Sequence, residues 1–249
     1  MRFSVIIPSY NQFQFIESTL QNIVALKKLC LENNHEMEVI LFDNNSNEQT
    51  QRIIQNYATH IDVLNIESDK GQYEAINKGL KHVTGDYWTW LNTDDLIDLH
   101  GFLAICNYLK NNQPDYIYGD IELIDASGKP LSSATSGAIT LSKLTIQDAS
   151  ISQPGSFFKT SFTNKIGNLQ PYRFAFDYEY ILRILKNNGT VVHIKDIVSQ
   201  FRYYEQSKSG SKDPRFLIEQ WQIAKLYGSR FYNKLFIILI LRIIKRKLF

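Results

Sequence analysis

Cysteine is scarce in this chain of 249 residues: Cys30 and Cys106 are the only two, and they lie far apart. This excludes a disulfide framework or a zinc ribbon and makes a reducing compartment the default expectation. The sequence also lacks any run of about 18 uncharged apolar residues, so it predicts no membrane span. Lys and Arg total 27 against 25 Asp and Glu, a net charge of +2. That balance gives no positive field that would predict a nucleic-acid partner.

Glycine is absent until Gly71. A glycine-rich dinucleotide fingerprint or a P-loop in the first strand-to-helix turn is therefore impossible. This argues against a hydride-transferring Rossmann enzyme and against a P-loop kinase. Any phosphate bound near the first strands has to be held by a metal ion and side chains.

The first hundred residues alternate between two kinds of segment. Strands are expected at 3–8, 38–42, 61–66 and 87–91, and helices at 13–31, 50–57 and 72–82. Such repeats predict an α/β fold with a mostly parallel sheet flanked by helices, whose ligands bind beyond the carboxyl ends of the strands. The segments at those ends are all polar: Ser9 and Tyr10, 43–46, 68–72 and 92–95.

The second half has a different pattern. A hairpin is expected from strands 116–124 and 130–133, joined by a turn-rich connection. A helix is predicted at 177–187, closed by Gly189, and a strand at 191–194. Residues 207–213 are predicted to form a flexible loop, and Pro214 to open a C-terminal helix.

The segment Asn92-Thr93-Asp94-Asp95 is the strongest local feature. Adjacent carboxylates at a strand end repel each other unless a cation or hydrogen-bond donors compensate. Mg²⁺ and Mn²⁺ take such oxygen ligands together with substrate phosphates. The alternative is that Asp94 or Asp95 caps a helix that begins at Leu96.

Two other aspartates are candidates. Asp43 follows a predicted strand and could accept a hydrogen bond from a nucleobase or ribose, or simply close an Asx-turn. Asp177 lies where a helix is expected to begin, with Arg183 placed to pair with Glu179. The alternative there is a helix cap beside a surface ion pair. No G-x-S-x-G elbow and no metal-type histidine spacing occurs.

Together these segments resemble a known family. The blocks at 4–11, 42–46, 69–79 and 91–95, followed by 153–158 and 177–183, resemble successive blocks of family 2 glycosyltransferases. The resemblance runs from about residue 3 to about residue 210. It implies a GT-A fold and the inverting transfer of a sugar from a nucleoside diphosphate donor, assisted by Mg²⁺ or Mn²⁺.

Matched by position, the resemblance implies a role for each candidate. The nucleotide would be bound by Pro8, Ser9, Tyr10, Asp43, Asp69, Lys70, Gly71, Gln72, Asn92 and Asp94. Asp94 would hold the metal ion, assisted by Asp95 or Asn92, and Asp177 would be the catalytic base. Two departures stand out: Asn92 occupies the first acidic place of the family's D-x-D pattern, and Phe176 stands where many relatives have a second acid.

The domain expectation is a GT-A domain at 1–213, with a nucleotide-binding half at 1–98 and an acceptor half at 99–213. Residues 214–249 are expected to form a basic, amphipathic helical tail, because 231–249 hold five basic residues and no acidic one. Such a tail suits an in-plane helix on anionic lipid, or a helix packed against the domain or a partner.

The resemblance also bears on partners and place. It implies a donor of the UDP or dTDP type, a saccharide or lipid-linked acceptor, and a role in polysaccharide biosynthesis. The expected location is cytoplasmic, with peripheral contact at the inner face of the cell membrane left open. Two alternatives remain: a sugar nucleotidyltransferase, which lacks support because 8–12 is not a glycine-rich basic loop, and a catalytically silent nucleotide-sugar-binding partner, which Asn92 favours.

Overall fold

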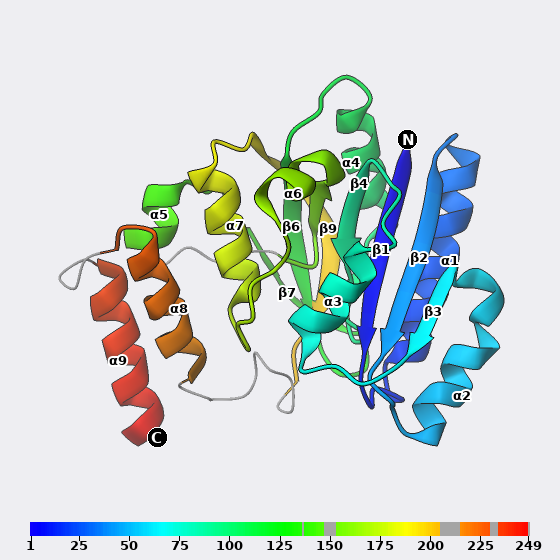
Figure 1. Ribbon diagram of the computed structural model, residues 1–249, viewed down its shortest axis with the longest axis horizontal. Helices are drawn as coiled ribbons and strands as arrows, with labels where there is room; N and C mark the ends of the chain where they lie inside the picture. Colours follow the sequence, from blue (N-terminus) through cyan, green and yellow to red (C-terminus); the bar gives the residue numbers. More distant parts are fainter. Residues whose placement is uncertain (136, 147–152, 205–214, 230–233, 249) are drawn as a thin grey trace.

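The computed structural model describes residues 1–135, 137–146, 153–204, 215–229 and 234–248. The strands are β1 (Arg2–Ser9), β2 (Glu36–Asp43), β3 (Val63–Ile66), β4 (Tyr87–Trp90), β5 (Leu96–Ile97), β6 (Tyr116–Ile124), β7 (Pro130–Ala134), β8 (Ser156–Lys159) and β9 (Val191–Arg202). The helices are α1 (Ile16–Glu32), α2 (Glu48–Asn56), α3 (Gln72–Leu80), α4 (Leu99–Leu109), α5 (Leu141–Ile146), α6 (Thr160–Ile166), α7 (Phe176–Lys186), α8 (Arg215–Leu226) and α9 (Lys234–Leu248), with a 3-10 turn at Ala58–His60. The expected α/β fold is confirmed (Figure 1).

One sheet runs through the molecule in the order β3-β2-β1-β4-β8-β6-β9-β5, and β7 pairs with β6. The first four strands of that order pair in parallel. β8 then runs antiparallel to both β4 and β6, β9 runs parallel to β6, and β5 and β7 add antiparallel edges. The sheet is therefore mixed, and the expected parallel arrangement holds for β3, β2, β1 and β4.

Alternation along β1 explains why both faces of the sheet are covered. Ile6 belongs to one apolar core with α3, α7 and α8, whereas Val5 and Ile7 belong to another with α1 and α4. Because successive side chains of a strand point to opposite faces, a strand with apolar side chains on both faces needs helices on both sides. The outcome is a layered molecule with the carboxyl ends of the parallel strands left open.

Two of the alternative interpretations of the sequence are wrong. The segment after Asp95 is the short strand β5, and the following helix α4 is capped by Asp98, whose Oδ1 accepts from Gly101 N at 2.8 Å. Helix α7 begins after Ala175, so Asp177 lies within its first turn instead of capping it. Neither Asp94 nor Asp95 is thus committed to a helix end.

The predicted hairpin is confirmed as β6 and β7, but β9 extends far beyond the expected strand at 191–194. It pairs with β6 along its whole length through register shifts near Gly119. A Cβ atom on Gly119 would lie 2.1 Å from the Val198 side chain, so only glycine admits this close approach. The exposed residues Lys195 and Asp196 sit at the irregularity and concealed the continuation of the strand.

The C-terminal segment forms two helices, α8 and α9, where one tail was expected. They pack together at one end of the molecule beside α5 and α7, remote from α1 and α2 (Figure 1). The loop predicted at 207–213 and Pro214 lie outside the described residues. Within the described ranges, no helix is both long and apolar enough to cross a bilayer.

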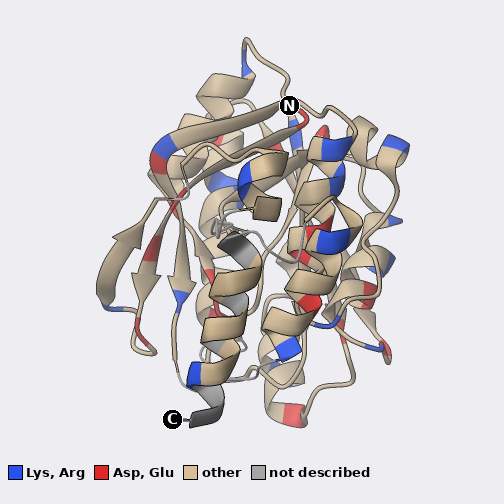
Figure 2. Cartoon of the chain, turned by 90° about the vertical axis from the view of Figure 1, so that its left-hand side faces the viewer, with Lys and Arg blue, Asp and Glu red and all other residues tan. Residues whose placement is uncertain are grey.

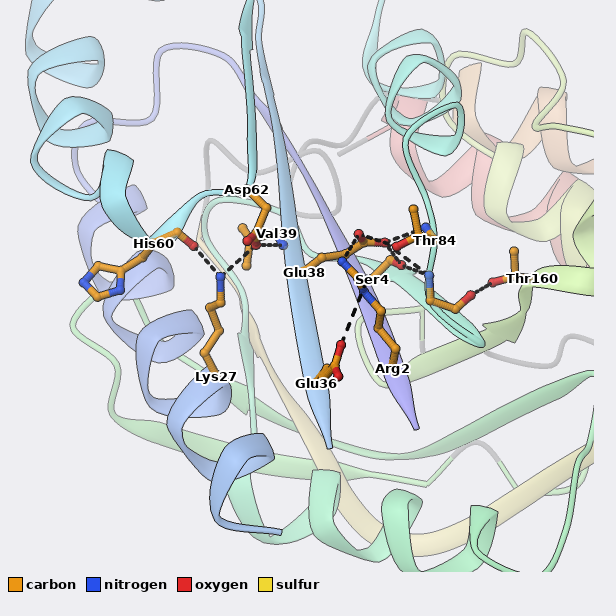
Figure 3. Close-up of polar contacts among 11 residues, drawn as sticks. Arg2, Ser4, Lys27, Glu36, Glu38, Val39, His60, Asp62, Thr84 and Thr160 are labelled. Carbon is orange, nitrogen blue, oxygen red and sulfur yellow. Dashed lines mark hydrogen bonds and ion pairs between the residues drawn. The ribbon is translucent and has the colours of Figure 1, made fainter. Parts of the chain in front are cut away.

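A buried carboxylate organises the amino ends of the parallel strands (Figure 3). Glu38 of β2 accepts hydrogen bonds from Ser4 Oγ, from Thr84 N at 2.6 Å and from Thr84 Oγ1 at 2.7 Å, and it pairs with Arg2 at 3.0 Å. Burial raises the pKa of this carboxyl, but the hydrogen bonds from Ser4 and Thr84 and the charge of Arg2 outweigh burial and leave the pKa below its usual value. Glu38 thereby fixes the turn that leads into β4, whose other end carries Asn92 to Asp95.

Candidate functional site

A cavity of about 760 Å³ opens at the carboxyl ends of the parallel strands. Most of the residues predicted to bind the nucleotide line it: Pro8, Ser9, Tyr10, Asp69, Lys70, Gly71, Gln72, Asn92 and Asp94. The structure therefore brings together four polar segments that are far apart in the sequence. Asn44, from the polar segment 43–46, also lines the cavity, and lining residues that the sequence analysis missed include Gln12, Tyr73, Pro171, Arg173, Arg202 and Tyr204.

Asp43 lies behind the cavity wall, with 1% of its surface exposed. Its carboxylate accepts from Ser9 Oγ at 2.8 Å, from Ser46 Oγ at 2.5 Å and from Ser46 N at 2.8 Å. The next residue, Asn44, lines the cavity and accepts from Asp69 N at 2.9 Å. Asp43 thus fastens the ends of β1 and β2 together, and Asn44 presents the polar atoms there.

The loop before α3 depends on one glycine. Gly71 has φ +134°, a conformation that side chains rarely adopt, and its N–H donates to Asp69 Oδ1 at 2.8 Å. Lys70 N donates to Glu74 Oε2 at 2.5 Å, which closes the first turn of the helix. Burial raises the pKa of Asp69, partly opposed by the hydrogen bond from Gly71. This loop places Lys70 and Gln72 at the cavity.

Asn92 is the centre of a hydrogen-bonded chain of side chains. The Gln72 amide donates to Asn92 Oδ1, and Asn92 Nδ2 donates to Asp95 Oδ2 at 2.9 Å. Asp95 Oδ1 accepts from Arg202 N at 3.0 Å. An ionised aspartate at position 92 would have no hydrogen to donate to Asp95, so this contact depends on the amide.

Asp95 is completely buried and does not line the cavity. Burial, and then the charge of Asp94, raise its pKa well above the usual value. One of its oxygens accepts a hydrogen bond from Asn92 and the other accepts one from Arg202. Asp95 therefore fixes the loop at 92–95 to the end of β9. This position does not support the prediction of Asp95 as a metal ligand.

Asp94 faces the cavity beside the end of β9. Its Oδ2 accepts from Tyr204 Oη at 2.9 Å, and its main-chain carbonyl accepts from Arg202 Nε at 2.9 Å. Phe15 packs against both partners, with ring centroids 4.9 Å from Tyr204 and the Arg202 guanidinium 4.9 Å above its ring. The available sequence signal was the basic and aromatic run at 202–204, which spans the end of β9, a strand that the sequence analysis ended at residue 194.

Asp177 lies within the first turn of α7, half-buried, and is not among the residues that line the cavity. Pro171 and Arg173, just before this helix, do line it. Burial raises the pKa of the Tyr116 hydroxyl, and the nearby charge of Asp177 adds to that rise. The Asp177 carboxylate therefore lies near Tyr116 of β6, four residues beyond the cavity-lining Arg173. Glu179 and Arg183 form an ion pair at 2.7 Å that is largely buried, so the expectation of a surface pair is wrong.

The oxygen ligands available at the cavity decide whether a metal ion fits. Within the part of the chain that the structure describes, no group of three or more His, Cys, Asp or Glu side chains is arranged to hold a metal ion. Asp94 and Asp69 are carboxylates at the cavity, with Asn92 and Thr93 oxygens beside Asp94. One or two carboxylates suit Mg²⁺ or Mn²⁺ when diphosphate oxygens and water complete the coordination. The residues present fit such an ion.

Solved structures share this architecture. S. aureus TarS 1-349, in complex with UDP-GlcNAc, matches with a TM-score of 0.71 at 18% identity, over 97% of this chain and 72% of TarS 1-349. Mannosyltransferase PcManGT from Pyrobaculum calidifontis, in complex with GDP-Man and Mn²⁺, gives 0.67 at 16% identity, over 97% and 69% of the two chains. The fold is therefore that of the GT-A class.

The family follows from the sequence comparison. Residues 4–176 match the model of "Glycosyl transferase family 2", and this chain belongs to that family. A "PGL/p-HBAD biosynthesis glycosyltransferase" of Mycobacterium bovis is 25% identical over 203 residues, 79% of this chain and 74% of the relative. A Rickettsia bellii glycosyltransferase is 31% identical over 131 residues, 51% of this chain and 18% of that protein. The match to the family model ends just before Asp177, so α8 and α9 lie beyond it.

Proposed function

We propose that this protein transfers a sugar from a nucleoside diphosphate sugar, of the UDP or dTDP type, to a hydroxyl group of a saccharide or lipid-linked acceptor, with inversion at the anomeric carbon. The observation that carries the proposal is the cavity at the parallel strand ends, where Asp69, Lys70 and Asp94 meet Arg173. A nucleoside diphosphate needs a polar base site, cationic groups and a place for a divalent ion, and this cavity offers all three.

The nucleoside would lie along the ends of β1 and β2. Tyr10, with 58% of its surface exposed, offers a ring at the cavity on which a base can stack. Asn44 offers an amide there, and Asp43 Oδ1, which carries one hydrogen bond, keeps capacity for an imide N–H if the base reaches it. In this proposal Asp43 acts on the base subsite mainly by fixing Ser9.

The diphosphate would lie between the 68–72 loop and Asp94. Lys70 and Arg173 line the cavity and are suited to pair with phosphate oxygens. Asp94 would hold Mg²⁺ or Mn²⁺, with Asn92 oriented by Gln72 and Asp95. When bound, the ion neutralises the charge that develops on the leaving diphosphate.

Asp177 would accept the proton of the attacking acceptor hydroxyl. It follows Arg173 by four residues, so the proposed donor wall and base are parts of one continuous segment. A single displacement, with the hydroxyl attacking opposite the departing diphosphate, inverts the anomeric configuration. No covalent sugar-enzyme intermediate is needed.

Nucleotide release from nucleotide sugars tests this function. UDP-glucose, UDP-GlcNAc, a dTDP-sugar and GDP-Man are each incubated with wild type and Asp94→Asn, with Mn²⁺ or with EDTA. We expect slow, Mn²⁺-dependent release with at least one donor and its loss in Asp94→Asn. Glu36→Gln, at an exposed site far from the cavity, is the control and should match wild type. Stabilisation by UDP without release from any donor would favour a catalytically silent binding protein.

We further propose that α9 brings the enzyme to an anionic membrane surface that carries its acceptor. Ile237, Leu241 and Ile244 recur at i, i+4 and i+7 along one face of α9 and are exposed, at 53%, 61% and 48%. A neighbouring face packs inward through Phe236, whose ring lies 5.5 Å from that of Trp221, and through Ile243. Figure 2 shows the molecule from the end at which α9 lies.

Charge favours a lipid surface as the occupant of this face. Residues 231–249 contain five basic residues and no acidic one, which suits anionic headgroups. Flotation with phosphatidylglycerol-containing and pure phosphatidylcholine vesicles tests the idea. Wild type should float with the anionic vesicles only, and a Leu241→Glu and Ile244→Glu double variant should not. Equal behaviour of wild type and the double variant would remove the proposal, and dimerisation lost in the double variant would assign the face to a second copy.

A further inference from the structure

Helix α8 holds the main chain of the segment that leads into α7 through one side chain, while the Arg215 guanidinium of α8 lies 5.7 Å from the centre of the Phe174 ring. The Glu219 carboxylate of α8 accepts hydrogen bonds from three consecutive main-chain N–H groups, those of Arg173 at 2.9 Å, Phe174 at 2.6 Å and Ala175 at 2.8 Å. A carboxylate with three such donors on adjacent residues leaves the segment little freedom.

The local sequence explains why α7 needs this contact. Its N-cap residue, Ala175, has no side chain that can cap the helix, and no side-chain cap is formed there. The first N–H groups of a helix lack partners within the helix, and negative charge near them is favourable. Glu219 places a negative charge near this end of α7 and accepts from the N–H groups of residues 173–175, which lead into the helix.

The segment held by Glu219 connects two parts of the proposed active site. Arg173 lines the donor cavity, and Asp177 follows Ala175 by two residues in the first turn of α7. A shift of residues 173–175 would therefore move the proposed base relative to the donor. Misplacing a catalytic group by about 1 Å can lower a rate about a hundredfold.

We propose that Glu219 is a positioning residue for glycosyl transfer: it sets the place of Asp177 relative to the donor cavity by clamping residues 173–175. The inference rests on the proposed function, because it assigns Glu219 a task in that reaction. It also gives α8, which lies beyond the segment matched to the family model, a part in catalysis.

A second contact between the same two helices provides a matched comparison. Tyr227, just after α8, donates from Oη to Glu179 Oε1 at 2.6 Å. Glu179 also pairs with Arg183 through bonds of 3.1 Å and 2.7 Å, so it stays partnered when the tyrosine hydroxyl is removed. Tyr227→Phe therefore weakens the packing of α8 on α7 without touching the clamp on residues 173–175.

The experiment compares Glu219→Ala, Glu219→Gln, Tyr227→Phe and the exposed-site control Gln222→Ala in the full chain. The assay is Mn²⁺-dependent nucleotide release from whichever of UDP-glucose, UDP-GlcNAc, a dTDP-sugar and GDP-Man wild type turns over fastest. For each variant, kcat and KM are measured with the melting temperature. We expect Glu219→Ala to lower kcat about tenfold to a hundredfold, with donor KM changing less than about threefold.

The other variants separate positioning from stability. Glu219→Gln keeps one acceptor oxygen and should recover part of the lost kcat. Tyr227→Phe should lower the melting temperature while keeping kcat within about twofold of wild type, and Gln222→Ala should change neither. If Glu219→Ala does not fold, Glu219→Gln against Tyr227→Phe makes the same comparison.

Two results would overturn the inference alone: a Glu219 variant whose kcat stays within about twofold of wild type, or losses of kcat in Glu219 and Tyr227 variants that simply follow their melting temperatures. A wild-type protein that binds UDP but turns over no donor would instead overturn the proposed function. The two failures are therefore distinguishable.

Discussion

The Asn92 side chain donates a hydrogen bond of 2.9 Å to Asp95, a carboxylate with no exposed surface. The contact gives a structural role to the amide at position 92, the place where the D-x-D pattern has an acid. The amide joins Gln72 on one side to Asp95 on the other, which a carboxylate cannot do. Reduced metal affinity is thus not the only consequence to expect from an amide at this position.

Replacing Asn92 with aspartate should therefore destabilise the protein. The variant would leave Asp95 without one donor and add a third carboxylate beside Asp94 and Asp95, a loss of about 1–3 kcal/mol in unfolding free energy. Crowded carboxyls have raised pKa values in the folded state, so the loss should grow from pH 5 to pH 8. Urea unfolding at both pH values without metal measures it, and added Mn²⁺ should reduce the difference from wild type.

Asn107→Asp is the matched control for that prediction. Asn107 is exposed on α4, and its Oδ1 accepts from Lys110 Nζ at 2.9 Å, a contact that aspartate would keep. A stability loss at position 107 equal to that at position 92 would contradict the assignment of a special role to Asn92.

Much of the nucleotide half could be predicted from the sequence, because each β-strand there ends in polar residues and parallel strands bring such ends together. Asp94 was found in this way. Tyr204 and Glu219 were not, because they reach the site from β9 and α8, and no local pattern encodes which distant segment supplies a partner. Asp95 shows the converse: its residue type suggested a metal ligand, whereas its burial could be known only from the fold.

Asp177→Asn should abolish sugar transfer while nucleotide binding survives. An amide cannot accept the acceptor's proton, and loss of a general base lowers rates about 10²- to 10⁴-fold. Acceptor-dependent nucleotide release and the dissociation constant of the nucleotide, measured by calorimetry, give the two quantities. Asp196→Asn, at an exposed position of β9, should leave both unchanged. Near-normal transfer by Asp177→Asn would mean that another group is the base.

Glu38→Gln should weaken folding without altering the site. Because the folded-state pKa of Glu38 lies below the usual 4.5, its carboxylate stabilises the fold above that pH, and this contribution is lost as the pH falls through the lowered value. At pH 7 the variant should lose about 1–3 kcal/mol of unfolding free energy, since amide hydrogens would face the donors of Ser4 and Thr84. The difference in unfolding free energy between Glu38→Gln and wild type should narrow as the pH falls below about 4.5.

Urea unfolding across that range measures the effect. Glu36→Gln is the matched control, because Glu36 is an exposed neighbour that pairs weakly with Arg2 at 4.0 Å. It should be within about 0.5 kcal/mol of wild type at every pH. A gap between Glu38→Gln and wild type that stays constant down to pH 3 would show that the carboxylate charge is not what stabilises this turn.

Gly71→Ala should damage both stability and nucleotide binding. At φ +134° an alanine is strained by about 1–3 kcal/mol, and relief of that strain would shift the loop that places Lys70 and Gln72 at the cavity. Gly228→Ala is the control, because Gly228 has φ +101° with open space around it and lies away from the cavity. Both variants should lose similar unfolding free energy in urea. Weakened UDP binding in Gly71→Ala alone would then reflect loop geometry, whereas equal weakening in both would assign the effect to general destabilisation.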